Sequence, residues 1–118
     1  VDVDNHVPEK DPIAESIAYM KANINGLLSI KQLAANQNLS GSHYTALFKS
    51  KTGCPPIDYF IRLKMNFACQ LLKQSDFKIS EISTELGYDD VFYFSRLFKK
   101  VMGSSPLVYR QKLFNQTK

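Results

Sequence analysis

Apolar residues recur at helical spacing in several separate stretches of the chain, and polar or turn-forming residues separate these stretches. The first stretch follows Asp11 and Pro12, an N-cap residue and a first-turn proline, and continues to Asn25-Gly26. The longest runs from Pro56 to about Lys73 without an internal Gly or Pro, which predicts a stiff helix of about five turns. No segment reads convincingly as a strand. The pattern therefore predicts an all-α fold with roughly seven helices.

Shorter helices are expected on both sides of the long one. Ser29, Ser40 and Asp90 are suitable N-caps, while Gly53 and Gly103 are suitable helix stops. In these shorter helices the side facing the core is expected to carry Leu33, Ala34, Tyr44, Leu47, Phe48 and Lys51 in the first half of the chain, and Ile79, Ile82, Leu86, Phe94, Leu97, Phe98 and Val101 in the second.

The two halves of the chain repeat one another. Up to the turn, a shift of 49 residues aligns Ile30 with Ile79 and Leu33 with Ile82. Past the turn the shift is 50, which aligns Ser40 with Asp90, Tyr44 with Phe94, Phe48 with Phe98, Lys49 with Lys99, Gly53 with Gly103, Pro56 with Pro106 and Tyr59 with Tyr109. So many matches of equivalent chemistry indicate an internal repeat.

Each copy consists of a short helix, a tight turn and an N-capped helix, which is the pattern of a helix-turn-helix. The turn needs a residue that tolerates positive φ, and Asn38 and Gly87 stand there. Ala34 and Ser83 are small where the two helices of each copy are expected to cross. A solenoid of helical hairpins is the alternative, but two copies joined by a long helix do not stack as such arrays do.

The chain is expected to divide into four parts. Residues 1–10 are polar and irregular, so we expect a linker or tail there. Residues 11–55 would form the first helix-turn-helix unit, 56–74 the linking helix and 75–118 the second unit. Together they would make one compact module.

A family resemblance supports this organisation. Residues 79–110, ISEISTELGYDDVFYFSRLFKKVMGSSPLVYR, resemble the signature of the AraC/XylS family of transcription regulators, and residues 12–114 resemble its double, homeodomain-like helix-turn-helix domain throughout. The resemblance implies a bacterial regulator that binds DNA near promoters and often contacts RNA polymerase. It also implies an effector or dimerisation domain in a missing N-terminal part. Lys64, where the family prefers Arg, lacks the planar fork used in paired ion contacts, and Ser83 replaces a common Ala.

The helical wheel assigns an outward face to the two N-capped helices. In the third helix this face carries Ser42, Thr45, Ala46 and Lys49, and in the sixth helix it carries Phe92, Ser95, Arg96 and Lys99. Arg96 is suited to the O6 and N7 edge of guanine, and Phe92 to thymine methyl groups. The third helix offers only single hydrogen bonds, methyl contacts or water-bridged contacts, so its specificity should be looser.

Other residues are candidates for supporting contacts. His43 and Tyr93 flank the outward faces, where they either reach DNA or pack partly on a neighbouring helix. Lys49, Lys99 and Lys100 are expected to contact phosphates, which fix register without reading sequence. Weaker candidates are Arg62, Lys64, Lys73 and Arg110.

The charge distribution agrees with a polyanionic partner. The formal net charge is +4, but residues 1–16 hold five acidic residues against one lysine, so 14 basic and 6 acidic residues remain from position 17 onward. No run of residues is apolar enough for a membrane span or a secretion signal, and we expect a cytoplasmic, nucleoid-associated protein. Cys54 and Cys69 lack CxxC spacing and are expected to be reduced thiols.

The sequence favours DNA binding over catalysis. The only histidines are His6 and His43, and no paired carboxylates or nucleophile-base motif stands out, so we expect no enzyme, no cofactor and no metal site. The long helix, at about 27 Å, is close to the roughly 34 Å between successive major-groove passes. We therefore expect sequence-specific binding of double-stranded DNA, with two recognition helices in adjacent major grooves. The alternative is a helical protein-protein interaction module that uses Phe92 and Tyr93.

Overall fold

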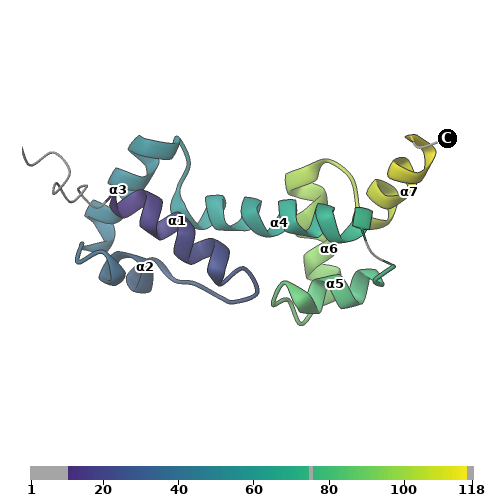
Figure 1. The fold of residues 1–118 in the computed structure, drawn as a ribbon, viewed down its shortest axis with the longest axis horizontal. Coiled ribbons are helices and arrows are strands. Elements are labelled where there is room, and N and C mark those ends of the chain that lie inside the picture. Colours follow the sequence, from purple (N-terminus) through teal and green to yellow (C-terminus); the bar gives the residue numbers. More distant parts are fainter. Residues whose placement is uncertain (1–10, 75, 117–118) are drawn as a thin grey trace, which may run out of the picture.

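Seven helices joined by short turns make up the part of the chain that the computed structural model describes, residues 11–74 and 76–116 (Figure 1). They are α1 (Pro12–Ala22), α2 (Ile30–Asn36), α3 (Gly41–Thr52), α4 (Pro56–Gln74), α5 (Ile79–Glu85), α6 (Val91–Met102) and α7 (Pro106–Gln116). No strand occurs in these ranges, which confirms the predicted all-α fold. The tail expected at residues 1–10 lies outside the described residues.

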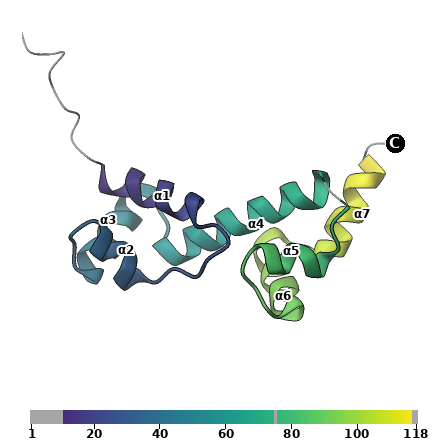
Figure 2. The same ribbon diagram turned by 60° about the horizontal axis from the view of Figure 1, so that its bottom comes forward.

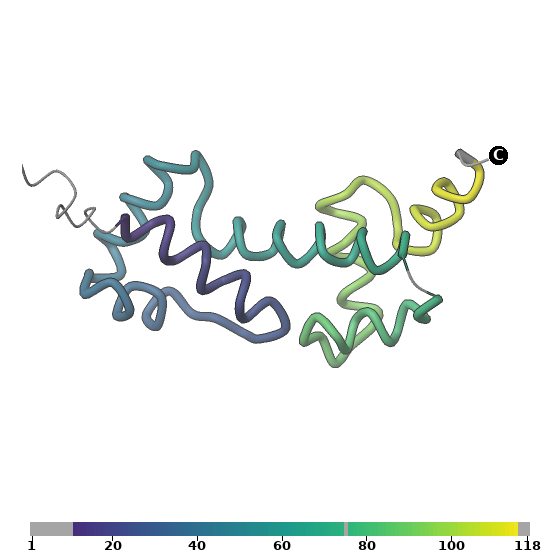
Figure 3. Tube along the Cα trace, in the orientation of Figure 1, coloured from purple at the N-terminus to yellow at the C-terminus, as the bar shows by residue number. Residues whose placement is uncertain are grey.

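The molecule is elongated, with principal extents of 58 × 33 × 22 Å, and α4 crosses its middle along the long axis (Figures 1 and 3). Helices α1, α2 and α3 gather around the first half of α4, and α5, α6 and α7 around the second half (Figure 2). In Figure 1, α1 lies in front of the other helices at its end of the molecule, whereas α6 passes behind α4. Two helical groups therefore share one central helix.

Capping side chains set most of the helix starts. Asp11 accepts hydrogen bonds from the N–H groups of Ile13 and Ala14, and the hydroxyl oxygens of Ser29 and Ser40 each accept one from the third residue of the helix that follows. Helix α5 begins differently, because the Lys78 N–H donates to the Glu81 carboxylate at 2.8 Å. The predicted caps are confirmed at α1, α2 and α3.

Helix α1 ends earlier than the sequence pattern predicts. It stops at Ala22, and not at Asn25-Gly26, because Asn23 leaves the helical conformation and donates from its side-chain nitrogen to the Tyr19 carbonyl at 2.8 Å. An asparagine at a helix end commonly bonds the backbone in this way. The chain after Asn23 is therefore free to turn toward the second helical group.

Two apolar clusters fill the interior. The first contains Ile13, Met20, Leu33, Ala34, Tyr44, Phe48 and Phe60, and the second contains Met65, Ala68, Leu72, Ile82, Leu86, Phe94 and Phe98. Helix α4 contributes to both, with the boundary between Phe60 and Met65. Ile24, just past α1, packs against both clusters. The buried Ser16 hydroxyl hydrogen-bonds the Tyr44 hydroxyl, so the polar end of this core tyrosine has a partner.

The internal repeat is visible in the packing. In the first copy Phe48 contacts Tyr44 at 5.8 Å between ring centroids and meets Tyr59 edge to face at 5.3 Å. In the second copy the equivalent trio is Phe94, Phe98 and Tyr109, with corresponding distances of 6.0 and 5.6 Å. The turn residues are equivalent too: Asn38 has φ 58° and Gly87 has φ 86°. Both predicted left-handed positions are confirmed.

Lys51 corrects the prediction for the inner side of α3. Its side chain is exposed, whereas Tyr44 and Phe48 on the same helix are buried. Lys51 lies in the last turn, one residue before the helix ends at Thr52, where a long charged side chain can reach solvent. The equivalent residue of the second copy, Val101, is half-buried.

Lys64 is the second correction, because this candidate for a phosphate contact is 1% exposed. Its ammonium donates to the Leu86 carbonyl oxygen and lies 4.8 Å from the ring centroid of Phe60 and 5.1 Å from that of Tyr88. Burial lowers the pKa of Lys64 to about 8. Lys64 therefore connects α4 to the turn between α5 and α6 and cannot reach DNA.

The same turn also meets the first helical group. At Gly87 an added β-carbon would stand 2.3 Å from the backbone oxygen of Asn25 and 3.6 Å from the Lys64 nitrogen. The loop after α1, the turn after α5 and the middle of α4 thus meet at one place, which we call the junction: Asn25, Lys64, Leu86, Gly87 and Tyr88. It fixes how the two helical groups sit relative to each other.

Gly87→Ala should therefore destabilise the protein by about 3 kcal/mol, because it combines positive φ with a clash against backbone. Gly53→Ala is the matched control, since Gly53 also has positive φ (81°) but no atom within 4 Å of an added β-carbon. It should cost about 1 kcal/mol. Urea unfolding of both variants measures the difference, and equal losses would contradict the close approach at Gly87.

Lys64 should also give the protein a specific pH dependence. Above pH 8 the folded state loses the Lys64 proton while the unfolded state, with its usual pKa of 10.5, keeps it, so the free energy of unfolding rises with pH by up to about 1.4 kcal/mol per unit. Burial raises the pKa of Tyr88 to about 12, so this neighbour stays protonated in that range. Unfolding of the parent and of Lys64→Met between about pH 7 and 10 should show stability increasing in the parent relative to the variant. A constant difference would refute this.

Candidate nucleic-acid interface

Helix α6 presents its predicted face to solvent. The Asp90 carboxylate accepts from the N–H groups of Phe92 at 2.9 Å and Tyr93 at 3.3 Å, which fixes the first turn. Phe94 and Phe98 are fully buried and hold the opposite side of the helix against the core. The predicted residues on the outer side are exposed at Phe92, Tyr93, Arg96, Lys99 and Lys100, and half-buried at Ser95.

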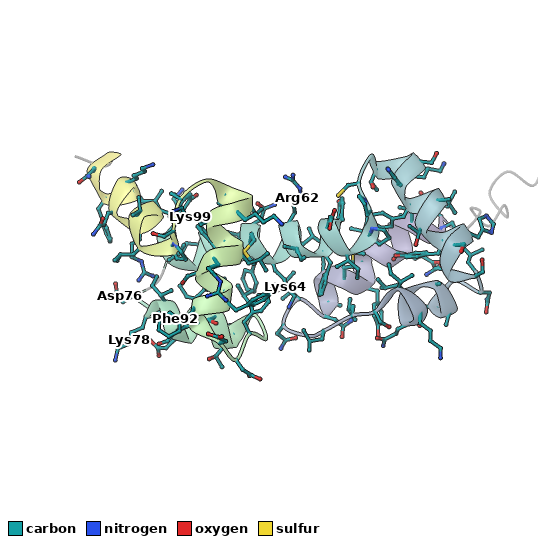
Figure 4. The ribbon with its side chains drawn as sticks, turned by 180° about the vertical axis from the view of Figure 1, so that it is seen from behind. Arg62, Lys64, Asp76, Lys78, Phe92 and Lys99 are labelled. Atoms are coloured by element: carbon teal, nitrogen blue, oxygen red, sulfur yellow. The ribbon has the colours of Figure 1, made fainter. Side chains whose placement is uncertain are left out.

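Among these exposed side chains, Phe92 is the one whose exposure to water is least favourable, because its ring is large and apolar. It is 73% exposed near the start of α6, and Figure 4 shows Phe92 and Lys99 at different heights on this helix. Tyr93, the next residue, is also exposed, and adjoining exposed aromatic side chains are typical of a surface that contacts a partner. Arg96, one helical turn after Phe92, supplies the positive charge.

Tyr93 combines the two roles that its position in the sequence allowed. Its ring packs on the Tyr88 ring with centroids 5.9 Å apart, yet the residue remains 49% exposed. The contact with Tyr88, which itself lies over the Lys64 ammonium, anchors the start of α6 to the junction. The exposed half of Tyr93 remains accessible to a partner.

Helix α3 presents the corresponding face of the first copy. Ser42, His43, Ala46 and Lys49 are exposed, and Thr45 is half-buried. The Ser40 cap, which accepts from the His43 N–H at 3.1 Å, fixes the first turn as Asp90 does in α6. The side chains are shorter than in α6, and no arginine lies on this face. The structure therefore exposes both predicted faces, one from each helical group, with α4 between them (Figure 1).

The weaker candidates for phosphate contacts fall into three kinds. Lys64 is buried, and the Arg110 side chain donates from Nε to the Leu72 carbonyl at 3.2 Å, so it packs on α4. Lys73 is exposed near the end of α4. Arg62 is exposed and borders, together with Lys100, a hollow between α4 and α6. Arg62 could not be singled out from the sequence, because Lys100, its neighbour at this hollow, is far away along the chain.

Other kinds of site find no support in the part of the chain that the structure describes. Within residues 11–74 and 76–116 there is no group of three or more His, Cys, Asp or Glu side chains placed to hold a metal ion. Cys54 and Cys69 are half-buried and not joined to each other. In the same ranges, no helix combines the length and the apolar character that crossing a membrane requires.

Comparison with known proteins identifies the family. The profile of a helix-turn-helix domain matches residues 33–112. The MmsAB operon regulatory protein of Pseudomonas aeruginosa is 47% identical over 96 residues, which are 81% of this chain and 31% of that protein. The chain spans about a third of the length of curated relatives of this kind.

Two solved structures resemble this chain in both fold and sequence. The DNA-binding domain of the global transcriptional factor AdpA, in complex with a target DNA, has a TM-score of 0.84 and 27% identity, covering 91% of this chain and 96% of that one. A transcriptional regulator of the AraC type from Chromobacterium violaceum has a TM-score of 0.80 and 28% identity, covering 86% and 91%.

These matches cover most of the described residues and include both exposed faces, so they decide between the DNA-binding and protein-interaction interpretations of the sequence. The chain belongs to the AraC family of bacterial helix-turn-helix transcription regulators, in which it is a sequence-specific DNA-binding domain and not an enzyme.

Proposed function

We propose that this domain binds one side of duplex DNA with α3 and α6 in two successive major grooves. The observation that carries the proposal is the pair of exposed, N-capped helix faces held on one central helix. Nineteen residues give α4 a length of about 28 Å, close to the roughly 34 Å between major-groove passes on one side of DNA. One copy of the chain can therefore engage two grooves.

Helix α6 is the stronger reader of sequence in this proposal. The Arg96 guanidinium offers two parallel donors to O6 and N7 of a guanine, and the exposed Phe92 ring packs against thymine methyl groups. Ser95 and Tyr93 border these two side chains and make supporting contacts to bases or phosphates. A bidentate arginine contact discriminates against a wrong base by about 1–3 kcal/mol.

Helix α3 reads its groove more loosely. Ser42 and Thr45 can each make one hydrogen bond with a base edge, and Ala46 can only make an apolar contact. His43 lies beside this face and reaches either a base or a phosphate. We therefore propose an asymmetric target or a direct repeat, because the two units are related by chain duplication and not by a dimer axis.

The exposed lysines hold the domain on the backbone. Lys49 and Lys99 are equivalent in the two copies, and Lys100 follows in α6. Their ammonium groups contact phosphates, which gives affinity and register on any sequence. In this proposal residues 11–55 and 75–118 form the two reading units and residues 56–74 the spacer between them.

The whole protein is proposed to be longer and to act in the cytoplasm on nucleoid DNA. The relative from Pseudomonas aeruginosa is about three times the length matched here and regulates an operon by its name. We propose that an effector or dimerisation domain belongs to the same protein, and that RNA polymerase is a partner at the promoter. The binding of purified RNA polymerase to a promoter, measured with and without this protein, tests whether the polymerase is a partner.

Arg96→Ala should weaken binding to the preferred duplex by about 1–3 kcal/mol and should remove the base preference at one position. Selection of bound duplexes from a random pool gives the preferred site for the parent, and the same selection with the variant shows which position has become indifferent. If the variant binds specific and random duplexes with the same affinities as the parent, the role assigned to Arg96 is wrong.

Lys49→Ala should have a different effect from Arg96→Ala. It should weaken binding to all duplexes by a similar factor and leave the selected sequence unchanged, because it removes a phosphate contact. The dependence of log K on log salt should become less steep by about one unit. A changed base preference would instead place Lys49 among the residues that read bases.

A further inference from the structure

A hollow of about 280 Å³ lies between α4 and α6. Side chains from the loop after α3, from α4 and from α6 border it: Cys54, Asp58, Ile61, Arg62, Leu97, Lys100 and Val101. It therefore joins parts of the chain that belong to different helix-turn-helix units.

The hollow is continuous with the reading face of α6. Leu97 and Lys100 also border a second hollow of about 230 Å³, whose other residues are Tyr93 and Arg96. Lys100 lies one helical turn after Arg96, so both side chains leave α6 on the same side. A duplex that contacts Arg96 thus passes next to the hollow that contains Arg62.

Arg62 is placed to face such a duplex. In Figure 4 it projects from α4 on the opposite edge of the helix from the buried Lys64, as expected for residues two positions apart. The side chains of Arg62 and Lys100 are both exposed, and no described residue forms an ion pair with either. Asp58 lies one turn before Arg62 on α4, the spacing at which a carboxylate helps to orient a cation.

The chemistry of the hollow suits one phosphate group. A planar guanidinium and a point-like ammonium approach from two different helices, and together they outweigh the single carboxylate of Asp58. Ile61, Leu97 and Val101 form apolar walls, which lower the local dielectric constant and strengthen the attraction between cation and anion. Charge-assisted hydrogen bonds to phosphate are stronger than those between neutral groups.

We propose that Arg62 and Lys100 bind one backbone phosphate together, in the DNA segment between the two major grooves that α3 and α6 occupy. The proposal rests on the proposed function, because it takes the placement of α6 on DNA from there. The contact connects the linking helix with the second unit through the DNA. We call it the bridging phosphate site.

Single substitutions test the site through salt dependence. Arg62→Gln and Lys100→Gln should each weaken binding to specific and random duplexes alike, by about three- to tenfold. Each should also make the slope of log K against log salt less steep by about one unit. Lys21→Gln is the matched control, because it removes an exposed positive charge from the last turn of α1, which carries neither exposed reading face. It should leave affinity and slope unchanged, and the melting temperature of all three variants should equal that of the parent.

A second measurement asks whether both side chains bind the same phosphate. Duplexes that carry one uncharged methylphosphonate at successive backbone positions should show, for the parent, one sensitive position between the two grooves. Both single variants should lose sensitivity at that same position. The double variant Arg62→Gln/Lys100→Gln should bind more tightly than the product of the two single losses predicts, because the residues share a partner.

The outcomes separate the bridging site from the proposed function. If the parent prefers no duplex, the proposed function fails. If the parent binds specifically but Arg62→Gln matches Lys21→Gln, or if Arg62→Gln and Lys100→Gln lose sensitivity at different phosphate positions, only the bridging site is wrong. The alternative ligand of this site is free phosphate instead of a DNA phosphate. Titration with inorganic phosphate, monitored through the NMR chemical shifts of Arg62 and Lys100, tests this alternative. Saturation by free phosphate combined with a flat methylphosphonate scan would also overturn the DNA contact.

Discussion

The position of one helix-turn-helix unit relative to the other depends on the buried ammonium of Lys64. Removing such a group from water is costly, and here one carbonyl oxygen and two aromatic rings offset part of the cost, while the lowered pKa of Lys64 reports the part that remains. These partners belong to α4 itself and to the turn between α5 and α6, so the ammonium is satisfied only when that turn lies against the middle of α4. The close backbone approach of Asn25 to Gly87 adds the loop after α1 to the same contact. A shift of either unit would leave a buried charge without a partner or create a clash.

The two copies of the repeat have the same buried packing but carry different side chains on the exposed faces of α3 and α6. Inside, Phe48 and Phe98 make the same edge-to-face contact with a tyrosine of the following helix, because each copy must close the same gap between helices. Outside, no packing partner restricts the side chain, so α6 carries an aromatic residue and an arginine where α3 carries serine and alanine. The buried residues thus determine where each recognition helix lies, while the exposed residues determine what it can recognise.

Features that depend on neighbours along the chain could be predicted from the sequence. The caps at Ser29, Ser40 and Asp90 and the positive φ of Asn38 and Gly87 are local, and the structure has all of them. Contacts between distant segments could not be predicted in this way, such as the approach of Asn25 to Gly87 or the common hollow of Arg62 and Lys100. Lys64 lies between these cases. It is four residues after Phe60 and four before Ala68, on the inner stripe of α4, but its charge suggested a surface position.

The packed junction has a consequence for how DNA is selected. Because interiors of this density resist deformation, α3 and α6 are held at one spacing and one relative angle. Any difference between that spacing and the distance between major grooves of straight DNA must then be taken up by the duplex and not by the protein. The energy of bending or twisting DNA depends on its sequence, including at base pairs that no side chain touches. A rigid double reading unit therefore selects its target through the stiffness of the segment between the grooves, as well as through the base contacts of Arg96 and Phe92.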